Sequence, residues 1–199
     1  GSSDTFEASV EPDMTKVGDI NNPIAVADSK GVPKETVEQV IIVPFNNIEV
    51  TRRLIEENHK EIAAFIIEPI MGSAGMLEPS REYLTFIRDI TNAYGIVLIF
   101  DEVVTFRLTT GGAQVYNGIS PDMTAFGKII GGGIPIGAFG GKEDIIKMYD
   151  PTAKMMYHSG TFNGNAISMA AGIAALKDYG AKEVDHVNRL GELFRSECN

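Results

Sequence analysis

Short apolar runs alternate with amphipathic segments along the middle of this chain, and this alternation limits the fold more than any other feature. The runs at 40–43, 63–68 and 95–100 have the length and composition of buried strands. Between them, residues 46–58 and 79–94 carry apolar side chains at helical spacing. This strand–helix order predicts an α/β fold around a mostly parallel sheet with right-handed crossovers.

Capping signals set the ends of both helices. Asn46, with Glu49 three residues later, predicts the start of the first helix. Ser80 with Glu82 opens the second, and Gly95 ends it. The buried face of the second helix is expected to comprise Tyr83, Ile87, Ile90 and Tyr94.

The second half of the chain departs from the parallel pattern. A short strand is expected at 123–126, and the apolar run at 136–141 follows Lys128 too closely for a helical crossover. That run is therefore predicted to be an antiparallel or edge strand. Three further helices are expected over 142–149, 163–178 and 181–197. The second of these is rich in alanine, which favours close packing through small residues.

Residues 1–38 are polar, acidic and interrupted by prolines, which is typical of a long solvated loop. A loop of this length in a compact domain is often a functional lid. We therefore expect an acidic loop or active-site lid over 1–38 and a folded core over 39–199.

Composition narrows the classes of function. The net charge of −10 disfavours nucleic acid as a partner, since an acidic chain repels phosphate backbones. No apolar stretch reaches the roughly 18 residues of a membrane span, and residues 1–5 lack the features of a signal peptide. The lone Cys198 favours a reducing compartment, so we expect a cytoplasmic protein.

Polar side chains stand at or just beyond the ends of three apolar runs. These are Glu68, Asp101 and Lys128. In parallel sheets ligands bind beyond the carboxyl ends of the strands. An acid there can hold a pyridinium nitrogen, and an amine can form a Schiff base with an aldehyde. Apolar neighbours would desolvate the Lys128 amine and favour its nucleophilic form. Together these groups point to pyridoxal 5'-phosphate.

Each of these residues also has an ordinary structural interpretation. Asp101 could cap a helix or pair with Arg107, and Lys128 could be a surface lysine on a glycine turn. The run 159–165, which precedes the Ala-rich helix, could bind an anion or could simply be an N-cap. The three histidines lack metal-ligand spacing, so no metal site is expected.

Several motifs, in order over roughly residues 39–180, resemble the class III, fold-type-I pyridoxal-phosphate aminotransferases. The similarity is greatest to the glutamate-1-semialdehyde 2,1-aminomutase branch. The matching runs are Ile67-Glu68-Pro69, Asp101-Glu102-Val103, Gly111-Gly112-Ala113-Gln114, Ser120-Pro121-Asp122-Met123, Gly127-Lys128-Ile129-Ile130-Gly131-Gly132-Gly133, Ile136-Gly137-Ala138-Phe139-Gly140-Gly141 and Gly160-Thr161-Phe162-Asn163-Gly164-Asn165.

The resemblance implies a three-layer cofactor domain and a role for each matching residue. Lys128 would be the Schiff-base lysine and proton shuttle, Asp101 the pyridinium partner and Val103 a contact on one face of the ring. Thr161 would contact the phosphate of the cofactor in the other subunit, which implies a homodimer with shared active sites. Ser73 would lie in the loop that approaches the ring, and residues 1–31 would gate the site.

The chain also departs from the family pattern. The stretch Val104-Thr105-Phe106-Arg107 lacks the glycine that the family carries there, and Ser73 replaces the asparagine usual in the aminomutase branch. The second difference favours a general transaminase over an aminomutase. The N-terminal phosphate-binding region and the C-terminal small domain have no counterpart, so we expect a fragment.

The expected activity is transfer of an amino group to or from a small amino acid or amino aldehyde. Two alternatives stay open. A racemase or decarboxylase would use the same cofactor, and a truncated, non-catalytic chain would act only as a structural or dimerisation module.

Overall fold

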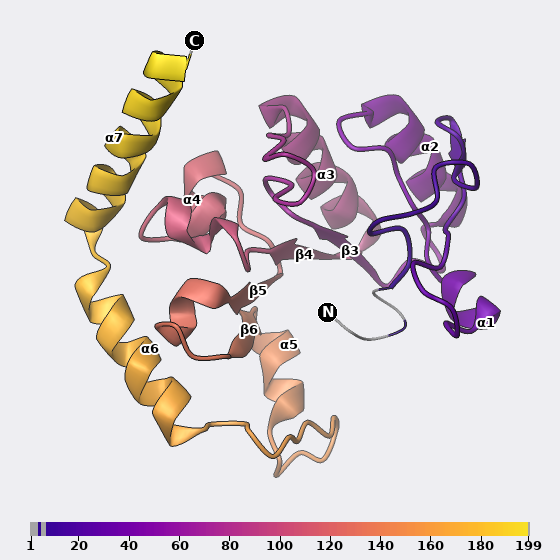
Figure 1. Ribbon diagram of the computed structural model, residues 1–199. Coiled ribbons are helices and arrows are strands. Elements are labelled where there is room, and N and C mark those ends of the chain that lie inside the picture. Colours follow the sequence, from indigo (N-terminus) through magenta and orange to yellow (C-terminus); the bar gives the residue numbers. More distant parts are fainter. Residues whose placement is uncertain (1–3, 5–6, 199) are drawn as a thin grey trace. The chain divides into compact units, whose positions relative to one another are not determined.

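The computed structural model describes residue 4 and residues 7–198 (Figure 1). The chain divides into two compact units, Gly1–Ile62 and Ala63–Asn199. The first unit therefore extends beyond the predicted loop over 1–38. One reason is that α2 (Ile48–Asn58) is joined to the N-terminal segment, because the Arg53 guanidinium donates a hydrogen bond to the backbone oxygen of Asn21.

The first unit contains little regular structure apart from α2. Strands β1 (Gly18–Asp19) and β2 (Asn22–Pro23) form a minimal antiparallel hairpin, and α1 (Lys34–Val37) is a single turn. Residues 1–3 and 5–6 of the predicted loop lie outside the described residues.

Two predictions in this unit were wrong. Residues 40–43 form no strand, because no described segment pairs with them and Ile41 is exposed. Helix α2 is capped by Asn47 instead of Asn46, since the Asn47 side chain accepts a hydrogen bond of 3.0 Å from the Val50 N–H. Local β propensity does not make a strand without a partner.

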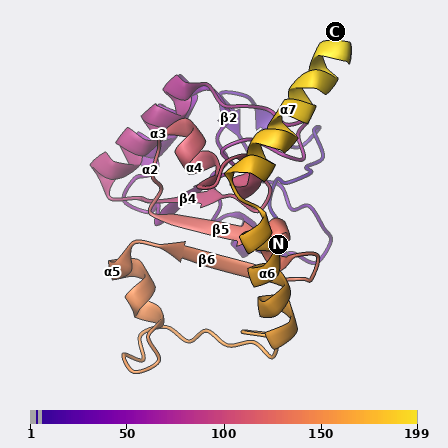
Figure 2. The ribbon, with the colours of Figure 1, turned by 90° about the vertical axis from the view of Figure 1, so that its left-hand side faces the viewer.

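The second unit is built on a sheet of four strands in the order β3-β4-β5-β6. The strands β3 (Ala64–Ile67), β4 (Val97–Asp101) and β5 (Met123–Gly127) are parallel, as predicted. Strand β6 (Gly137–Gly141) runs antiparallel to β5, as the short connection requires (Figure 2). The sheet is thus mixed but mostly parallel, in an α/β unit.

Helix α3 (Arg81–Tyr94) follows the predicted signals closely. The Ser80 hydroxyl accepts a hydrogen bond of 3.1 Å from the Tyr83 N–H, and Gly95 ends the helix in the left-handed conformation at φ 68°. Tyr83, Ile87 and Ile90 are buried as expected, whereas Tyr94 is exposed because it stands in the last turn. The buried side chains pack with Leu98 and Phe100 of β4 in the apolar core.

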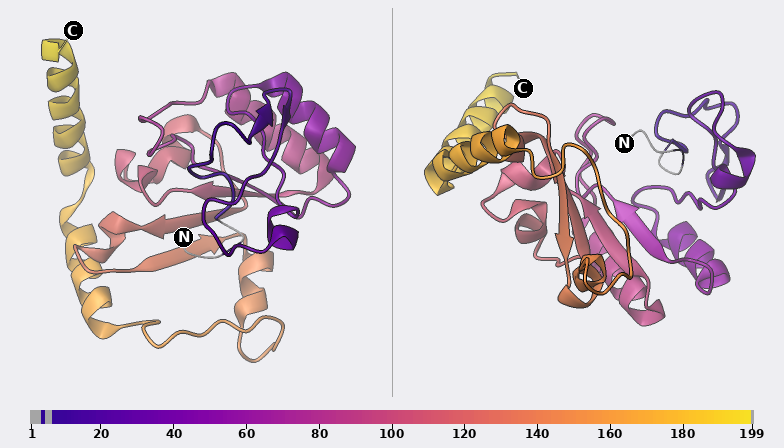
Figure 3. Two further views of the ribbon diagram at one scale, coloured as in Figure 1. Left: turned by 45° about the vertical axis from the view of Figure 1, so that its right-hand side comes forward. Right: turned by 90° about the horizontal axis from the view of Figure 1, so that it is seen from below.

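The rest of the second unit consists of short turns and two longer helices. Between β4 and β6 lie η2 (Thr105–Leu108), α4 (Gly112–Asn117) and η3 (Lys128–Gly131). After β6 come α5 (Glu143–Ile146) and η4 (Lys147–Tyr149), then a long connection without helix or strand (Figure 3). The unit ends with α6 (Ala166–Asp178) and α7 (Ala181–Cys198).

Much of the apolar surface of α6 and α7 is uncovered. Of the large apolar side chains of α7, Val184 is buried, while Leu190 and Phe194 are exposed. Within the described residues, no helix combines the length and the apolar character needed to cross a membrane.

Candidate functional site

The carboxyl ends of β3, β4 and β5 lie along one edge of the sheet, and this edge carries the predicted polar groups. Asp101 is the last residue of β4 and lies opposite Ala125 of β5. Lys128 follows β5 directly, and Glu68 follows β3 directly. The predicted placement of these three residues at neighbouring strand ends is therefore confirmed.

Lys128 stands in a strained backbone conformation at the tip of β5. Its φ is 50°, in the left-handed region that side chains other than glycine, asparagine and aspartate rarely occupy. Strain of this kind costs about 1–3 kcal/mol and clusters at functional sites. Lys128 is one of five described residues other than glycine with positive φ, and it is the one to which the sequence assigns the chemistry.

The expected apolar surroundings of the Lys128 amine are not found. Lys128 is exposed, because Phe126 and Ile130 turn toward α6 and line a groove there. The amine forms no hydrogen bond or ion pair with any residue that the structure describes. It is therefore accessible to a ligand approaching the sheet edge.

The Asp101 carboxylate is half-buried and fixed at one oxygen. Its Oδ1 accepts a hydrogen bond of 3.0 Å from the Val103 N–H, which closes an Asx turn. Asp101 and Arg107 form no ion pair, although both lie in the described part of the chain. The second carboxylate oxygen carries no bond from a described residue.

Val103 lies against the residue that precedes Lys128. A Cβ atom placed on Gly127 would lie 3.2 Å from Val103 Cγ1, so the valine side chain packs on the tip of β5. Val103 is half-buried there. The structure thus brings Val103 to the same edge as Asp101 and Lys128.

Ser73 belongs to an exposed loop that follows β3. The loop is closed by backbone hydrogen bonds between Met71 and Leu77. Glu68 anchors it, since Glu68 Oε2 accepts a hydrogen bond of 3.0 Å from the Gly72 N–H. A Cβ atom on Gly72 would also lie 3.5 Å from Val104 Cγ2, so the loop contacts the segment that follows β4. Glu68 therefore has a structural partner.

Thr161 stands apart from this group, in the exposed connection before α6. The helix begins at Ala166 and not at 163, and its N-cap is Asn165. The Asn165 side chain accepts hydrogen bonds from the N–H groups of Ile167 and Ser168. These amides are thus occupied, and the start of α6 is an ordinary N-cap.

Helix α6 packs directly on the turn that carries Lys128. Only Ser168 and Gly172 of this helix are buried, which confirms that it packs through small residues. The Ser168 hydroxyl donates a hydrogen bond of 3.1 Å to the Pro135 oxygen. Gly132 lies close to the Ala171 oxygen, since a Cβ atom placed there would lie 2.4 Å away.

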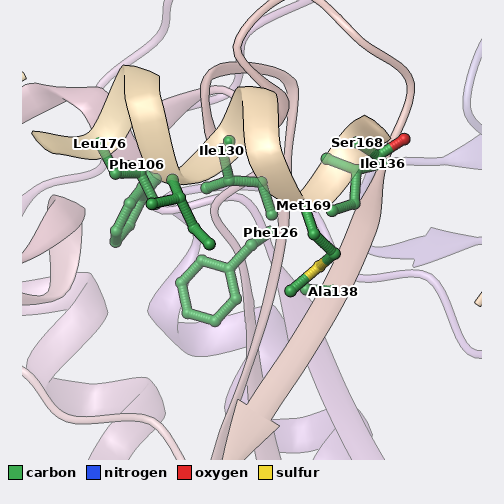
Figure 4. A pocket seen from close by; sticks show the side chains of 10 residues that line it. Phe106, Phe126, Ile130, Ile136, Ala138, Ser168, Met169 and Leu176 are labelled. Carbon is green, nitrogen blue, oxygen red and sulfur yellow. The ribbon is translucent and has the colours of Figure 1, made fainter. Parts of the chain in front are cut away.

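Beside this contact, α6 leaves an apolar groove of about 300 Å³ (Figure 4). Its walls come from β5, β6, η2, η3 and α6, and include Phe106, Phe126, Ile136, Met169 and Leu176. None of the five predicted site residues lines it. The groove is therefore separate from the predicted chemistry.

Asp122 forms a buried ionic network at the opposite edge of the sheet, just before β5. Its carboxylate accepts from Arg88 Nη2 at 3.0 Å, Lys142 Nζ at 2.6 Å and the Leu98 N–H at 2.7 Å. Burial by itself would raise the pKa of Asp122. The hydrogen bonds from Lys142, Arg88 and Leu98 outweigh it and lower the pKa below its ordinary value.

Sequence reasoning gave no role to Glu102, the residue between Asp101 and Val103. Its side chain is fully buried, and its carboxylate accepts hydrogen bonds from the start of α4. The pairing could have been suspected from the glycine pair at 111–112, which permits close approach of a side chain to the backbone. The described residues hold no cluster of three or more histidine, cysteine or acidic side chains suited to a metal ion.

Comparisons with known proteins find related sequences and structures. The family model "Aminotransferase class-III" matches residues 15–198. A glutamate-1-semialdehyde 2,1-aminomutase of Methanococcus maripaludis is 49% identical over 152 residues, which are 76% of this chain and 35% of that protein.

Solved structures match over nearly the whole chain. An omega-transaminase from Sphaerobacter thermophilus has a TM-score of 0.94 at 41% identity, over 98% of this chain and 45% of that one. A transaminase with PLP bound has a TM-score of 0.90 at 31% identity, with the same coverage. The chain thus spans between a third and a half of the length of these relatives.

Proposed function

This chain belongs to the class-III aminotransferase family, and we propose that it binds pyridoxal 5'-phosphate and transfers amino groups. The observation that supports the proposal is the placement of Asp101 and Lys128 at the carboxyl ends of two adjacent parallel strands. Membership of the family makes this the expected cofactor, and the sheet edge supplies groups for both of its reactive positions.

The residues at the sheet edge fit this cofactor. The cofactor needs an accessible amine for its aldehyde, and the Lys128 amine is exposed. It needs an anion for its ring nitrogen, and Asp101 keeps one oxygen without a bond from the described residues. It needs an apolar contact for a ring face, and Val103 lies beside Gly127.

When bound, pyridoxal 5'-phosphate supplies an aldehyde for condensation with amines and a pyridinium ring that accepts electrons. Lys128 would hold it covalently, and an amino substrate would then release the lysine. The freed Lys128 amine would carry a proton between the substrate carbon and C4′ of the cofactor. Asp101 would keep the ring nitrogen protonated, because a carboxylate beside a cation favours the charged form.

We propose a homodimer in which each subunit completes the site of the other. Thr161 would contact the phosphate of the cofactor held by the partner subunit. This assignment is supported by the exposure of the connection before α6, where Tyr157 and Phe162 are 92% and 81% exposed. Large apolar side chains presented in this way are typical of surfaces that become covered on assembly.

The substrate is proposed to be a small amino acid or amino aldehyde. Transfer to a separate acceptor would make the protein a transaminase, and transfer within one molecule would make it an aminomutase. The relatives include both kinds of enzyme. Ser73 in the loop after β3 favours the transaminase, because asparagine is the usual residue at this position in the aminomutase branch.

A spectroscopic titration tests the proposal. The purified full chain is mixed with pyridoxal 5'-phosphate, dialysed and examined for a visible absorption band, in parallel with Lys128→Ala. The proposal predicts a band retained by the unmodified chain and lost in the variant. Absence of any bound cofactor would contradict it and favour the non-catalytic dimerisation module. Product analysis with a panel of amino donors separates transaminase, aminomutase, racemase and decarboxylase.

A further inference from the structure

Glu102 places a buried carboxylate immediately behind the predicted cofactor site. The side chain is 0% exposed and follows Asp101 in the chain. Its carboxylate accepts hydrogen bonds from the Ala113 N–H, from the Gln114 N–H and side-chain amide at 3.1 Å each, and from the Thr105 hydroxyl at 3.3 Å. A buried carboxylate needs such partners, and this one is well supplied.

Three of the four donors belong to Ala113 and Gln114 at the start of α4, and the fourth is the Thr105 hydroxyl of η2. Glycine makes the approach of the α4 amides possible. Gly112 has φ 76°, and a Cβ atom placed on it would lie 2.5 Å from Glu102 Oε2. Any larger residue would push the carboxylate away from the backbone amides. Glu102 and Gly112 therefore form a matched pair that fixes the start of α4 beneath the sheet edge.

The backbone of Glu102 is held from the other side. Its N–H donates a hydrogen bond of 3.0 Å to the Ala125 oxygen of β5. The next N–H, that of Val103, is the donor that orients the Asp101 carboxylate. Movement of residues 102–103 would thus displace both the Asp101 carboxylate and the Val103 side chain at the sheet edge.

We propose that Glu102 is a positioning residue, whose carboxylate sets the orientation of Asp101 and the place of Val103 against the cofactor ring. The inference rests on the proposed function. Glu102 does not touch the cofactor and acts through its neighbours. Glu102→Gln keeps the size of the side chain but replaces one acceptor oxygen by an NH₂ group, which faces donors and cannot accept from them.

Asp122 provides the matched control. It is also a buried acid, 5% exposed, but it lies before β5, at the opposite edge of the sheet from Asp101. Asp122→Asn should lower the thermal midpoint of unfolding without changing the cofactor site. Gln114→Ala is a milder second variant, because it removes one donor to Glu102 and leaves the carboxylate in place.

The experiment measures two properties of each full-length variant. The first is the dissociation constant of pyridoxal 5'-phosphate, from titration of the visible band. The second is the pH at which the ring nitrogen of bound, nitrogen-15-labelled cofactor loses its proton, from NMR. We expect Glu102→Gln to weaken binding about tenfold, equal to about 1.4 kcal/mol. The ring nitrogen should lose its proton at lower pH, because Asp101 no longer holds it.

The outcomes separate the inference from the proposed function. Gln114→Ala should also weaken cofactor binding, but less than Glu102→Gln does. If Glu102→Gln fails to fold, Gln114→Ala alone tests the positioning role of Glu102. If Glu102→Gln and Gln114→Ala show the same cofactor dissociation constant and the same ring-nitrogen titration as Asp122→Asn, Glu102 is only a structural residue and the inference is overturned. If the unmodified chain binds no cofactor, the proposed function fails, and the inference fails with it.

Discussion

Gly172 of α6 lies directly against the carbonyl oxygen of Ile130, in the turn that begins with Lys128. A Cβ atom placed on Gly172 would lie 2.3 Å from that oxygen, much closer than real contacts allow. The helix can therefore approach the turn only through glycine, and the predicted catalytic lysine depends on this contact for its support.

We expect Gly172→Ala to destabilise the protein although it occupies a helix interior. Alanine gains about 1 kcal/mol over glycine in helix propensity. The clash of the new methyl group with the Ile130 oxygen forces α6 away from the turn, and this costs about 1–3 kcal/mol or more. Urea unfolding should therefore show a lower midpoint.

Gly191→Ala in α7 is the control for the preceding substitution. The nearest atom to a Cβ there is Arg195 Nη1, at 3.6 Å, which is ordinary contact with a flexible side chain. The free energy of unfolding of this variant should rise by about 0.5–1 kcal/mol. If both glycine variants were stabilised equally, α6 would not lie as close to the turn as the Gly172 contact requires.

The positive φ of Lys128 predicts an unusual order of stability. Lys128→Gly should be more stable than Lys128→Ala by about 1–2 kcal/mol, because glycine adopts φ 50° without steric cost. Denaturant midpoints of the two variants give the comparison. Equal midpoints would mean that the backbone at residue 128 is unstrained.

The lowered pKa of Asp122 predicts that the stability of the protein depends on pH. The pKa of Asp122 is lowered in the folded state, so its contribution to the free energy of unfolding is fully present above its unfolded-state pKa of about 3.9. This contribution is lost as the pH falls through the lower pKa of the folded state. Asp122→Asn should cost about 3 kcal/mol at pH 7, since Arg88 then lacks a charged partner.

The acid dependence is measured by urea unfolding of both proteins between pH 7 and pH 3. The difference in unfolding free energy between them should shrink toward the acid end. A difference that stayed constant would show that Asp122 titrates normally.

Loss of the Asn165 cap should weaken the start of α6. Asn165→Ala removes the acceptor for the Ile167 and Ser168 amides and should cost about 1 kcal/mol. Asn165→Asp should retain most of the stability, because aspartate is an equally good cap. Thermal unfolding compares the two variants, and equal losses would argue against a side-chain cap.

The sequence predicted the parts of the fold that depend on local signals. Ser80 and Gly95 delimit α3 because capping is decided by a few neighbouring residues. The antiparallel direction of β6 follows from the short connection after Lys128. Residues 40–43 have strand character but find no partner, and pairing between distant segments cannot be inferred from one short run.

The site was predictable only in part for a similar reason. Asp101 and Lys128 stand at strand ends, which periodicity reveals. The role of Glu102 depends on backbone amides that lie far along the chain, and on the left-handed conformation of Gly112. The exposure of Lys128 likewise follows from the direction in which Phe126 and Ile130 pack, toward α6.

Reduction with borohydride identifies the lysine that holds the cofactor. The full chain is loaded with pyridoxal 5'-phosphate, reduced and digested, and the modified peptide is identified by mass spectrometry. We expect one stable adduct, on Lys128, that is absent after digestion of Lys128→Ala. An adduct on another lysine, or cofactor bound without any adduct, would rule out Lys128 as the Schiff-base residue.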